Sequence, residues 1–175
     1  MTQGGVLSKA RLLILIALPL VLADCATKRA AVTYLQPPHT VHPVLGNAVR
    51  LTLAYNQQAV MSLQVGTNAR WLLIGTSVLV LAVLVRLLWT TRPSDRARAL
   101  GLALLIGGAT GNLLDRLASS RGVVDFIDMG LGGWRFWTFN VADAGITVGA
   151  ALLALAMWRG GTRSPSATGR GGVAT

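Results

Sequence analysis

The 175-residue sequence contains no glutamate, and its six acidic residues are all aspartate. Histidine and cysteine are equally scarce, with two residues of the first kind and one of the second. The single cysteine, Cys25, excludes an intramolecular disulfide. His39 and His42, the only histidines, lie together in a proline-rich segment, which argues against a histidine-based metal site. We therefore expect neither a metal nor another cofactor.

Hydrophobic residues make up 53% of the chain and are gathered in long runs rather than in short periodic ones. Four runs approach the roughly 20 residues that cross a hydrocarbon core, where only helices or closed barrels satisfy the backbone. The sequence predicts an all-α integral membrane protein with four transmembrane helices, at about 11–34, 71–89, 99–117 and 139–158. Residues 1–159 would form one membrane domain, and the glycine- and serine-rich residues 160–175 a disordered cytoplasmic tail.

The net charge of +10 raises the possibility of a nucleic-acid partner. The arginines, however, are scattered at the ends of the apolar runs and do not gather on one face, so we expect no nucleic acid. Basic flanks of this kind are typical of membrane topology. Arginines fill the link between the second and third runs and follow the fourth run, which predicts that this link and both termini are cytoplasmic.

Two longer loops would then lie on the extracytoplasmic side. The first, residues 36–69, contains VRLTLAY, whose alternating pattern predicts a short strand. The second, residues 118–138, contains VVDFID followed by LGGWRFW, which indicates a strand, a glycine turn and an aromatic interfacial patch. The fold class therefore includes a small extracytoplasmic β-strand region.

The first run also has features of a cleaved signal peptide, namely a basic start, an apolar core and the tetrapeptide LADC. Asp24 nevertheless occupies the position before the cysteine, where a small residue would be needed. Three further spanning runs follow it. We therefore expect the first helix to be retained.

Five of the six aspartates lie in or beside the apolar runs, and only Asp95 lies in an ordinary polar loop. A carboxylate at the centre of a transmembrane helix costs roughly 2.5–3.5 kcal/mol and marks a candidate functional site. Measured from the cytoplasmic ends at about 1.5 Å per residue, Asp24, Asp115 and Asp143 lie at depths of about 20, 25 and 22 Å. Three helices would thus bring a carboxylate to one level in the outer half of the membrane.

Each of these carboxylates has a polar neighbour at helical spacing. Lys28 follows Asp24 by four residues, Asn112 precedes Asp115 by three, and Asn140 precedes Asp143 by three. Any one pair is explained equally well by polar contacts that join helices. Three pairs at one depth favour a polar pocket, and paired aspartates can activate water to split a peptide bond.

Five motifs follow one another along the chain: DCATK (24–28), YNQQA (55–59), GGATGNLLDR (107–116), VVDFID (123–128) and FNVADAGI (139–146). Together they resemble the lipoprotein signal peptidase (signal peptidase II) family of bacteria. The patterns of that family are approximately D-x-x-T-K, N-x-G-A-A-F, G-G-A-x-G-N-x-x-D-R, V-x-D-F and F-N-x-A-D. The sequence departs from the second pattern, with Gln58 in place of glycine and Val60 and Met61 in place of Ala-Phe.

The resemblance implies an intramembrane aspartic endopeptidase that removes the signal peptide from diacylglyceryl-modified prolipoproteins, cleaving just before the lipidated cysteine. It implies that Asp125 and Asp143 are the catalytic pair. It also implies supporting roles for a set of pocket residues: Asp24, Lys28, Asn56, Asn112, Asp115, Arg116, Asn140 and Ala142. The implied location is the bacterial cytoplasmic membrane, with the active site towards the extracytoplasmic side. The expected partners are the lipid-modified prolipoprotein and membrane lipid, with no obligate protein partner.

The positions of the aspartates agree with this choice of catalytic pair. Asp143 lies near the start of the fourth helix, where the helix N-terminus favours a carboxylate, and Asp125 lies on a loop strand that can fold over the helices. Asp115 is followed at once by Arg116, which predicts a structural ion pair. Asp128 lies three residues beyond Asp125 and faces the other side of the strand, which predicts a loop-stabilising or solvent-facing role.

Two other classes of function share some of these features. A small ion- or proton-coupled transporter would also carry intramembrane acids, although these acids lie near one surface and do not form a path across the membrane. A non-catalytic membrane assembly factor would use the polar pairs only to join its helices. Such a factor would keep its function when both Asp125 and Asp143 were replaced by asparagine.

Overall fold

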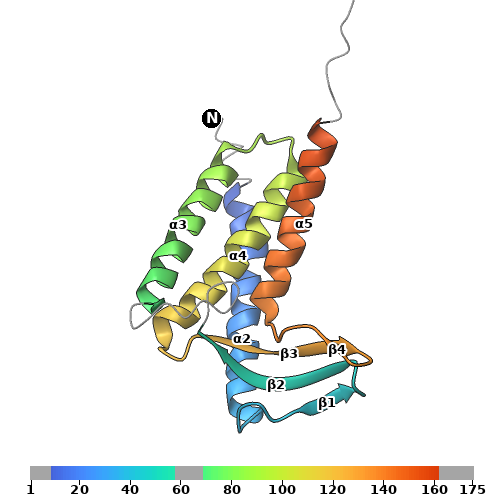
Figure 1. The fold of residues 1–175 in the computed structure, drawn as a ribbon. Coiled ribbons are helices and arrows are strands. Elements are labelled where there is room, and N and C mark those ends of the chain that lie inside the picture. Colours follow the sequence, from blue (N-terminus) through green and yellow to red (C-terminus); the bar gives the residue numbers. More distant parts are fainter. Residues whose placement is uncertain (1–8, 58–68, 162–175) are drawn as a thin grey trace, which may run out of the picture.

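The computed structural model describes residues 9–57 and 69–161. Four helices in it are long and apolar enough to cross a membrane (Figure 1). They are Lys9–Tyr34, which comprises a π-helical turn η1 (Leu13–Ala17) and α2 (Leu18–Tyr34), and then α3 (Ala69–Thr90), α4 (Arg96–Ala118) and α5 (Val141–Gly161). Every end lies within three residues of the predicted one. Residues 160 and 161 belong to α5, and the rest of the predicted disordered tail lies outside the described residues.

A four-stranded antiparallel sheet lies at one end of the helices (Figure 1). Its strands are β1 (His42–Leu45), β2 (Val49–Asn56), β3 (Val123–Leu131) and β4 (Trp134–Arg135), in the order β1-β2-β3-β4. The strands at VRLTLAY and VVDFID and the glycine turn after them are as predicted, whereas β1 comes from the proline-rich segment and was not expected. The fold is therefore helical with an added β-sheet rather than purely all-α.

Helix α4 packs against each of the other three long helices. Glycines allow its backbone to come very close to that of α5. A Cβ atom on Gly101 would lie 2.8 Å from the carbonyl oxygen of Gly149, and one on Gly149 would lie 2.8 Å from that of Gly101. Small residues at such crossings are typical of helices that pack in membranes. This close contact fixes the polar residues of α4 relative to the start of α5.

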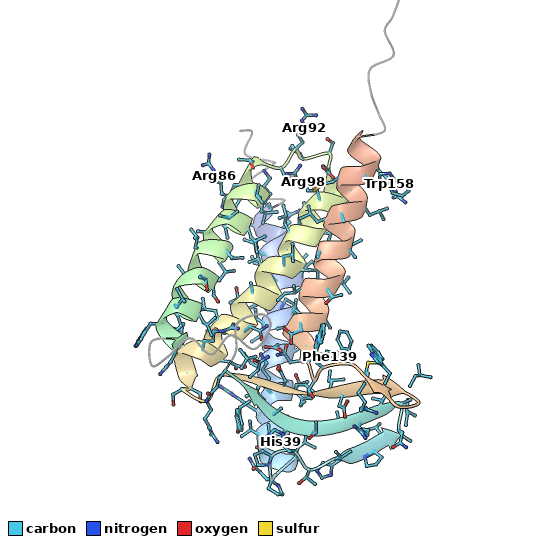
Figure 2. All side chains as sticks on the ribbon, viewed as in Figure 1. His39, Arg86, Arg92, Arg98, Phe139 and Trp158 are labelled. Carbon is cyan, nitrogen blue, oxygen red and sulfur yellow. The ribbon has the colours of Figure 1, made fainter. Side chains whose placement is uncertain are left out.

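The sheet is attached to the helices through its two faces. On one face, Val124 and Phe126 join a small hydrophobic core with Ala31 at the end of α2. Because side chains alternate along a strand, Asp125 points the other way. Ile127 exchanges backbone hydrogen bonds with Phe139, which lies two residues before α5. Strand β3 is thereby held between α2 and the start of α5, where Figure 2 shows Phe139.

Candidate active site

The start of α5 is fixed by a reciprocal pair of hydrogen bonds between Asn140 and Asp143. The amide oxygen of Asn140 accepts a hydrogen bond of 2.9 Å from the backbone N–H of Asp143. The carboxylate of Asp143 accepts one of 3.2 Å from the backbone N–H of Asn140. This is the capping-box arrangement, which satisfies two N–H groups that the helix leaves free. The spacing of three residues noted in the sequence therefore has a local structural cause.

The same asparagine reaches the second aspartate. Asn140 Nδ2 donates a hydrogen bond of 2.7 Å to Asp125 Oδ1, and Asn56 Nδ2 donates one of 3.1 Å to Asp125 Oδ2. The residue Asp125 is only 3% exposed. Its burial, followed by the negative charge of Asp143, raises the pKa of Asp125 to about 6, while the two asparagine amides act in the opposite direction. One fully buried side chain thus contacts both members of the predicted catalytic pair.

Asn112 on α4 orients Asp143 from the other side. Its Nδ2 donates a hydrogen bond of 2.8 Å to Asp143 Oδ1. Its Oδ1 accepts hydrogen bonds from Lys28 Nζ at 3.0 Å and from Asn140 Nδ2 at 3.2 Å. Because two donors face the amide oxygen, the NH₂ group of Asn112 is turned towards the carboxylate. The charge of Lys28 therefore acts on Asp143 through the orientation of this amide.

Lys28 is the buried cation at the centre of this network. Its ammonium group lies 2.7 Å from Asp24 and 2.9 Å from Asp115. The predicted pairing of Asp24 with Lys28 is confirmed. The prediction for Asp115 was wrong about the partner, because the ion pair is with Lys28, while Arg116 donates to the backbone oxygen of Asn112. Sequence adjacency misled here because residues i and i+1 point in different directions on a helix.

Asp24 and Asp115 also bind backbone groups of other elements. Asp24 Oδ1 accepts a hydrogen bond of 2.8 Å from the backbone N–H of Ala142, in the first turn of α5. Asp115 Oδ2 accepts one of 3.0 Å from the backbone N–H of Val124 on β3. A side chain on Gly111 would enter the space that the carboxylate of Asp24 occupies, because its Cβ would lie 2.5 Å from Asp24 Oδ2. These two carboxylates therefore hold α5 and β3 in place.

Asp128 forms a separate cluster on the opposite face of β3, as predicted. Its carboxylate lies 2.6 Å from Arg50 Nη2 and 2.7 Å from Arg135 Nε. Although burial opposes ionisation, hydrogen bonds and charge from Arg135 and Arg50 hold the pKa of Asp128 below its usual range. Of the two predicted roles, these contacts support the loop-stabilising one. Neither arginine was singled out in the sequence, where both are scattered among other basic residues.

A pocket of about 380 Å³ opens beside Asp125, and its walls include Asn56, Tyr55 and Thr138. The predicted site residues thus come together at the mouth of the helices, on α2, β2, α4, β3 and α5. Arg70 was missed by sequence reasoning, although it donates hydrogen bonds to the last carbonyl groups of α4, at Arg116 and Leu117. The departures at Gln58 and Met61 lie outside the described residues.

Comparisons with known proteins agree with this arrangement. The family described as Signal peptidase (SPase) II matches residues 16–159. The chain belongs to this family. The resemblance drawn from the motifs is therefore confirmed, and with it the general class of protease.

Individual relatives cover nearly the whole chain. The lipoprotein signal peptidase of Geobacillus kaustophilus (strain HTA426) is 37% identical over 143 residues, which are 82% of this chain and 90% of that protein. The lipoprotein signal peptidase of Syntrophotalea carbinolica is 38% identical over 162 residues, which are 90% and 97% of the two chains. A bacterial membrane enzyme determined by the in meso method superposes with a TM-score of 0.77 at 25% identity, over 90% of this chain and 94% of that one. The four apolar helices and this fold describe a multi-pass membrane protein.

Proposed function

We propose that this protein removes signal peptides from prolipoproteins as a membrane aspartic endopeptidase, with Asp125 and Asp143 as its catalytic pair. The main support is the position of Asn140, which hydrogen-bonds to both residues, beside a pocket that Asp125 lines. Two neighbouring carboxylates cannot both ionise cheaply, so the pair keeps one proton up to a higher pH than a lone carboxyl group would. That combination of one base and one acid is what water-mediated peptide hydrolysis requires.

The surroundings of the two carboxylates suggest how they divide the work. The carboxylate of Asp143 accepts N–H bonds from Asn112 and from the backbone at the start of α5, which suits a base that takes a proton from water. Asp125 is buried, and its raised pKa suits the group that carries the proton. As water attacks the scissile carbonyl carbon, Asp125 gives its proton to the carbonyl oxygen. When the carbon–nitrogen bond breaks, the proton held by Asp143 passes to the leaving amine, and one hydroxyl group of the intermediate returns its proton to Asp125 as the carbonyl re-forms.

The substrate would be a prolipoprotein whose cysteine already carries a diacylglyceryl group, cut on the N-terminal side of that cysteine. A site at the end of the helices suits such a substrate, because the acyl chains can stay in lipid while the scissile bond reaches the pocket. Arg92 and Arg98 lie at the other end of the bundle, far from the sheet (Figure 2). By the positive-inside rule, that end would be cytoplasmic and the catalytic pair would face the extracytoplasmic side of the bacterial cytoplasmic membrane.

The proposal is tested by cleavage of a diacylglyceryl-modified lipobox peptide by purified protein in detergent. We expect wild type to cleave before the modified cysteine, and Asp125→Asn and Asp143→Asn to lose cleavage at equal amounts of folded protein. Asp128→Asn is the matched control, because it changes the same chemical group on the same strand outside the network. Equal cleavage by all three variants would refute the assignment of the pair, and an inactive, well-folded wild type would refute the proposed reaction.

A further inference from the structure

A second pocket, of about 650 Å³, lies between α2, the end of α4 and the start of β3. It is separate from the pocket beside Asp125, because the described residues that line it include neither Asp125 and Asp143 nor the asparagines that contact them. Lys28 and Asp115 form the wall between this pocket and the network around the proposed catalytic pair. The volume is in the range of sites that bind a small organic molecule.

The walls of this second pocket are mainly apolar and continue into the outer surface of α2. Cys25 and Val32 line the pocket and lie seven residues apart on one side of that helix. Towards the N-terminal end of α2, the same side carries Leu22 and Leu18, at spacings of three and four residues. These two leucines are 59% and 49% exposed. A hydrocarbon chain can therefore extend from the pocket along a membrane-spanning helix.

Two arginines without a carboxylate partner give the pocket a positively charged end. Arg29 comes from α2 and Arg121 from the turn between α4 and β3, and both residues are exposed. All six aspartates lie among the described residues, and none of them forms an ion pair with either arginine. The one carboxylate in the described walls, that of Asp115, is paired with Lys28. Guanidinium groups of this kind are well suited to bind a phosphate.

Tyr55 brings a hydroxyl group to the same end of the pocket. It lies opposite Val124 on the paired strand, so the two side chains share the face of the sheet that packs against α2, and both residues line the pocket. The guanidinium group of Arg121 lies 4.6 Å from the centre of the Tyr55 ring. The hydroxyl is buried and has no hydrogen-bond partner in the described part of the chain. Buried hydroxyl groups are normally hydrogen-bonded, and a phosphate oxygen beside Arg121 would supply the acceptor.

We propose that this pocket binds an anionic phospholipid, whose phosphate contacts Arg29 and Arg121 and whose acyl chain follows α2 past Cys25 and Leu22. A membrane lipid is the occupant because the pocket joins a cationic end to an apolar surface that continues along a spanning helix. Free phosphate would match only the cationic end, and an uncharged chain only the apolar surface. Basic pockets between transmembrane helices are known to bind anionic headgroups.

Bound lipid would connect α2, α4 and the sheet, because residues of all three line the pocket. Anything that binds the folded protein and not the unfolded chain stabilises the fold by mass action. The proposal goes beyond the proposed function and does not depend on it, since neither member of the proposed catalytic pair lines the pocket.

The experiment uses the thiol of Cys25, the only one in the chain, which is half-buried in the pocket wall. Delipidated full-length protein in detergent is treated with a maleimide, and the rate of alkylation is measured without lipid, with dioleoylphosphatidylglycerol or with dioleoylphosphatidylcholine. We expect phosphatidylglycerol to slow alkylation about tenfold at ten times its dissociation constant, and phosphatidylcholine to slow it much less. Equal protection by the two lipids, or protection by neither, would overturn the proposal.

The two arginines are tested together by Arg29→Gln with Arg121→Gln. We expect the double variant to lose the difference between the two lipids. Arg86→Gln is the matched control, because Arg86 is an exposed arginine of α3 at the end of the bundle remote from the sheet (Figure 2), and it should keep the difference. A difference that persists in the double variant, or that is also lost in the control, would overturn the proposal.

Glycerol 3-phosphate and a lipobox peptide without lipid test the two other kinds of occupant. Protection of Cys25 by either one as strong as that by phosphatidylglycerol would overturn the proposal. If the thiol of Cys25 reacts too slowly to follow, Ala118→Cys in a Cys25→Ala chain reports on the same pocket, because Ala118 is exposed and lines it. Thermal unfolding gives an independent readout: phosphatidylglycerol should raise the melting temperature of wild type more than that of the double variant, and an equal rise in both would contradict the proposal.

Discussion

Replacement of Asp125 by asparagine is expected to make the protein more stable at neutral pH while it abolishes cleavage. Burial and the nearby charge of Asp143 raise the pKa of Asp125 from 3.8 to about 6. A carboxyl group with a raised pKa in the folded state binds its proton more tightly there than in the unfolded state. Its contribution to stability is therefore complete below about pH 4 and is lost as the pH rises towards about 6.

The size of this loss of stability follows from the shift in the pKa of Asp125. About two pKa units at 1.36 kcal/mol each correspond to about 3 kcal/mol of unfolding free energy at pH 7. Asparagine has nearly the same shape and carries no charge. Its single oxygen can accept from only one of the amides of Asn56 and Asn140, and its NH₂ group meets the other, which offsets part of the gain. The variant should therefore gain up to about 3 kcal/mol over wild type at pH 7 and almost nothing at pH 4. Thermal or denaturant unfolding in detergent, followed by tryptophan fluorescence between pH 4 and 7, measures the difference.

Asp128→Asn provides a matched comparison, because its expected change in stability at pH 7 has the opposite sign. Although burial opposes it, the contacts with Arg135 and Arg50 lower the pKa of Asp128, so its stabilising effect is present above about pH 4 and is lost as the pH falls further. Asp128→Asn should cost roughly 1.5–3 kcal/mol at pH 7, the usual value of a charged hydrogen bond, and less in more acidic solution. If Asp125→Asn and Asp128→Asn shift stability in the same direction at pH 7, the reasoning is refuted.

Three further changes test the network that supports the proposed catalytic pair. Gly111→Ala places a methyl group 2.5 Å from the carboxylate of Asp24, so cleavage and melting temperature should both fall. Gly75→Ala is the control, because its Cβ would have no described atom within 4 Å, and it should leave both unchanged. Lys28→Met leaves two carboxylates without their cation and should cost about 3–5 kcal/mol in detergent unfolding; wild-type stability would contradict the ion network. Asn140→Ala removes the helix cap and a hydrogen bond to the buried carboxylate of Asp125, and should lower the unfolding free energy by about 2–4 kcal/mol. Asn140→Ser should lose less, because its hydroxyl can still cap the helix. Equal losses would contradict the capping role.

The four helices and the level of the polar residues could be predicted because both depend on local features of the sequence. A long apolar run defines a span by itself, and a rise of 1.5 Å per residue places Asp24, Asp115 and Asp143 at one depth. The spacing of Asn140 and Asp143 likewise reports a contact within one helical turn. Each of these predictions needs no knowledge of which helix lies beside which.

The contacts between distant segments could not be derived from the same local patterns. The second carboxylate partner of Lys28 is Asp115, on another helix, and its choice depends on how α2 and α4 pack. Ala142 has no polar side chain, and it enters the network only through its backbone N–H. Strand β1 was missed because Pro43 within it, and Pro37 and Pro38 before it, favour a loop, although an edge strand tolerates a proline. The family motifs indicated that several of these residues matter, and the structure supplies the contact that each one makes.

The bond between Asp24 and Ala142 joins the first long helix to the last one, 118 residues later in the chain. During synthesis, therefore, the carboxylate of Asp24 cannot bind the backbone N–H of Ala142 until the final helix has entered the bilayer. The pair Asp125 and Asp143 forms only at that moment, because Asp143 arrives on the same helical turn as Ala142. If Asp125 and Asp143 are the catalytic pair, as proposed, a nascent chain has no peptidase activity until its last helix is inserted, and the bond to Asp24 sets the depth of that helix.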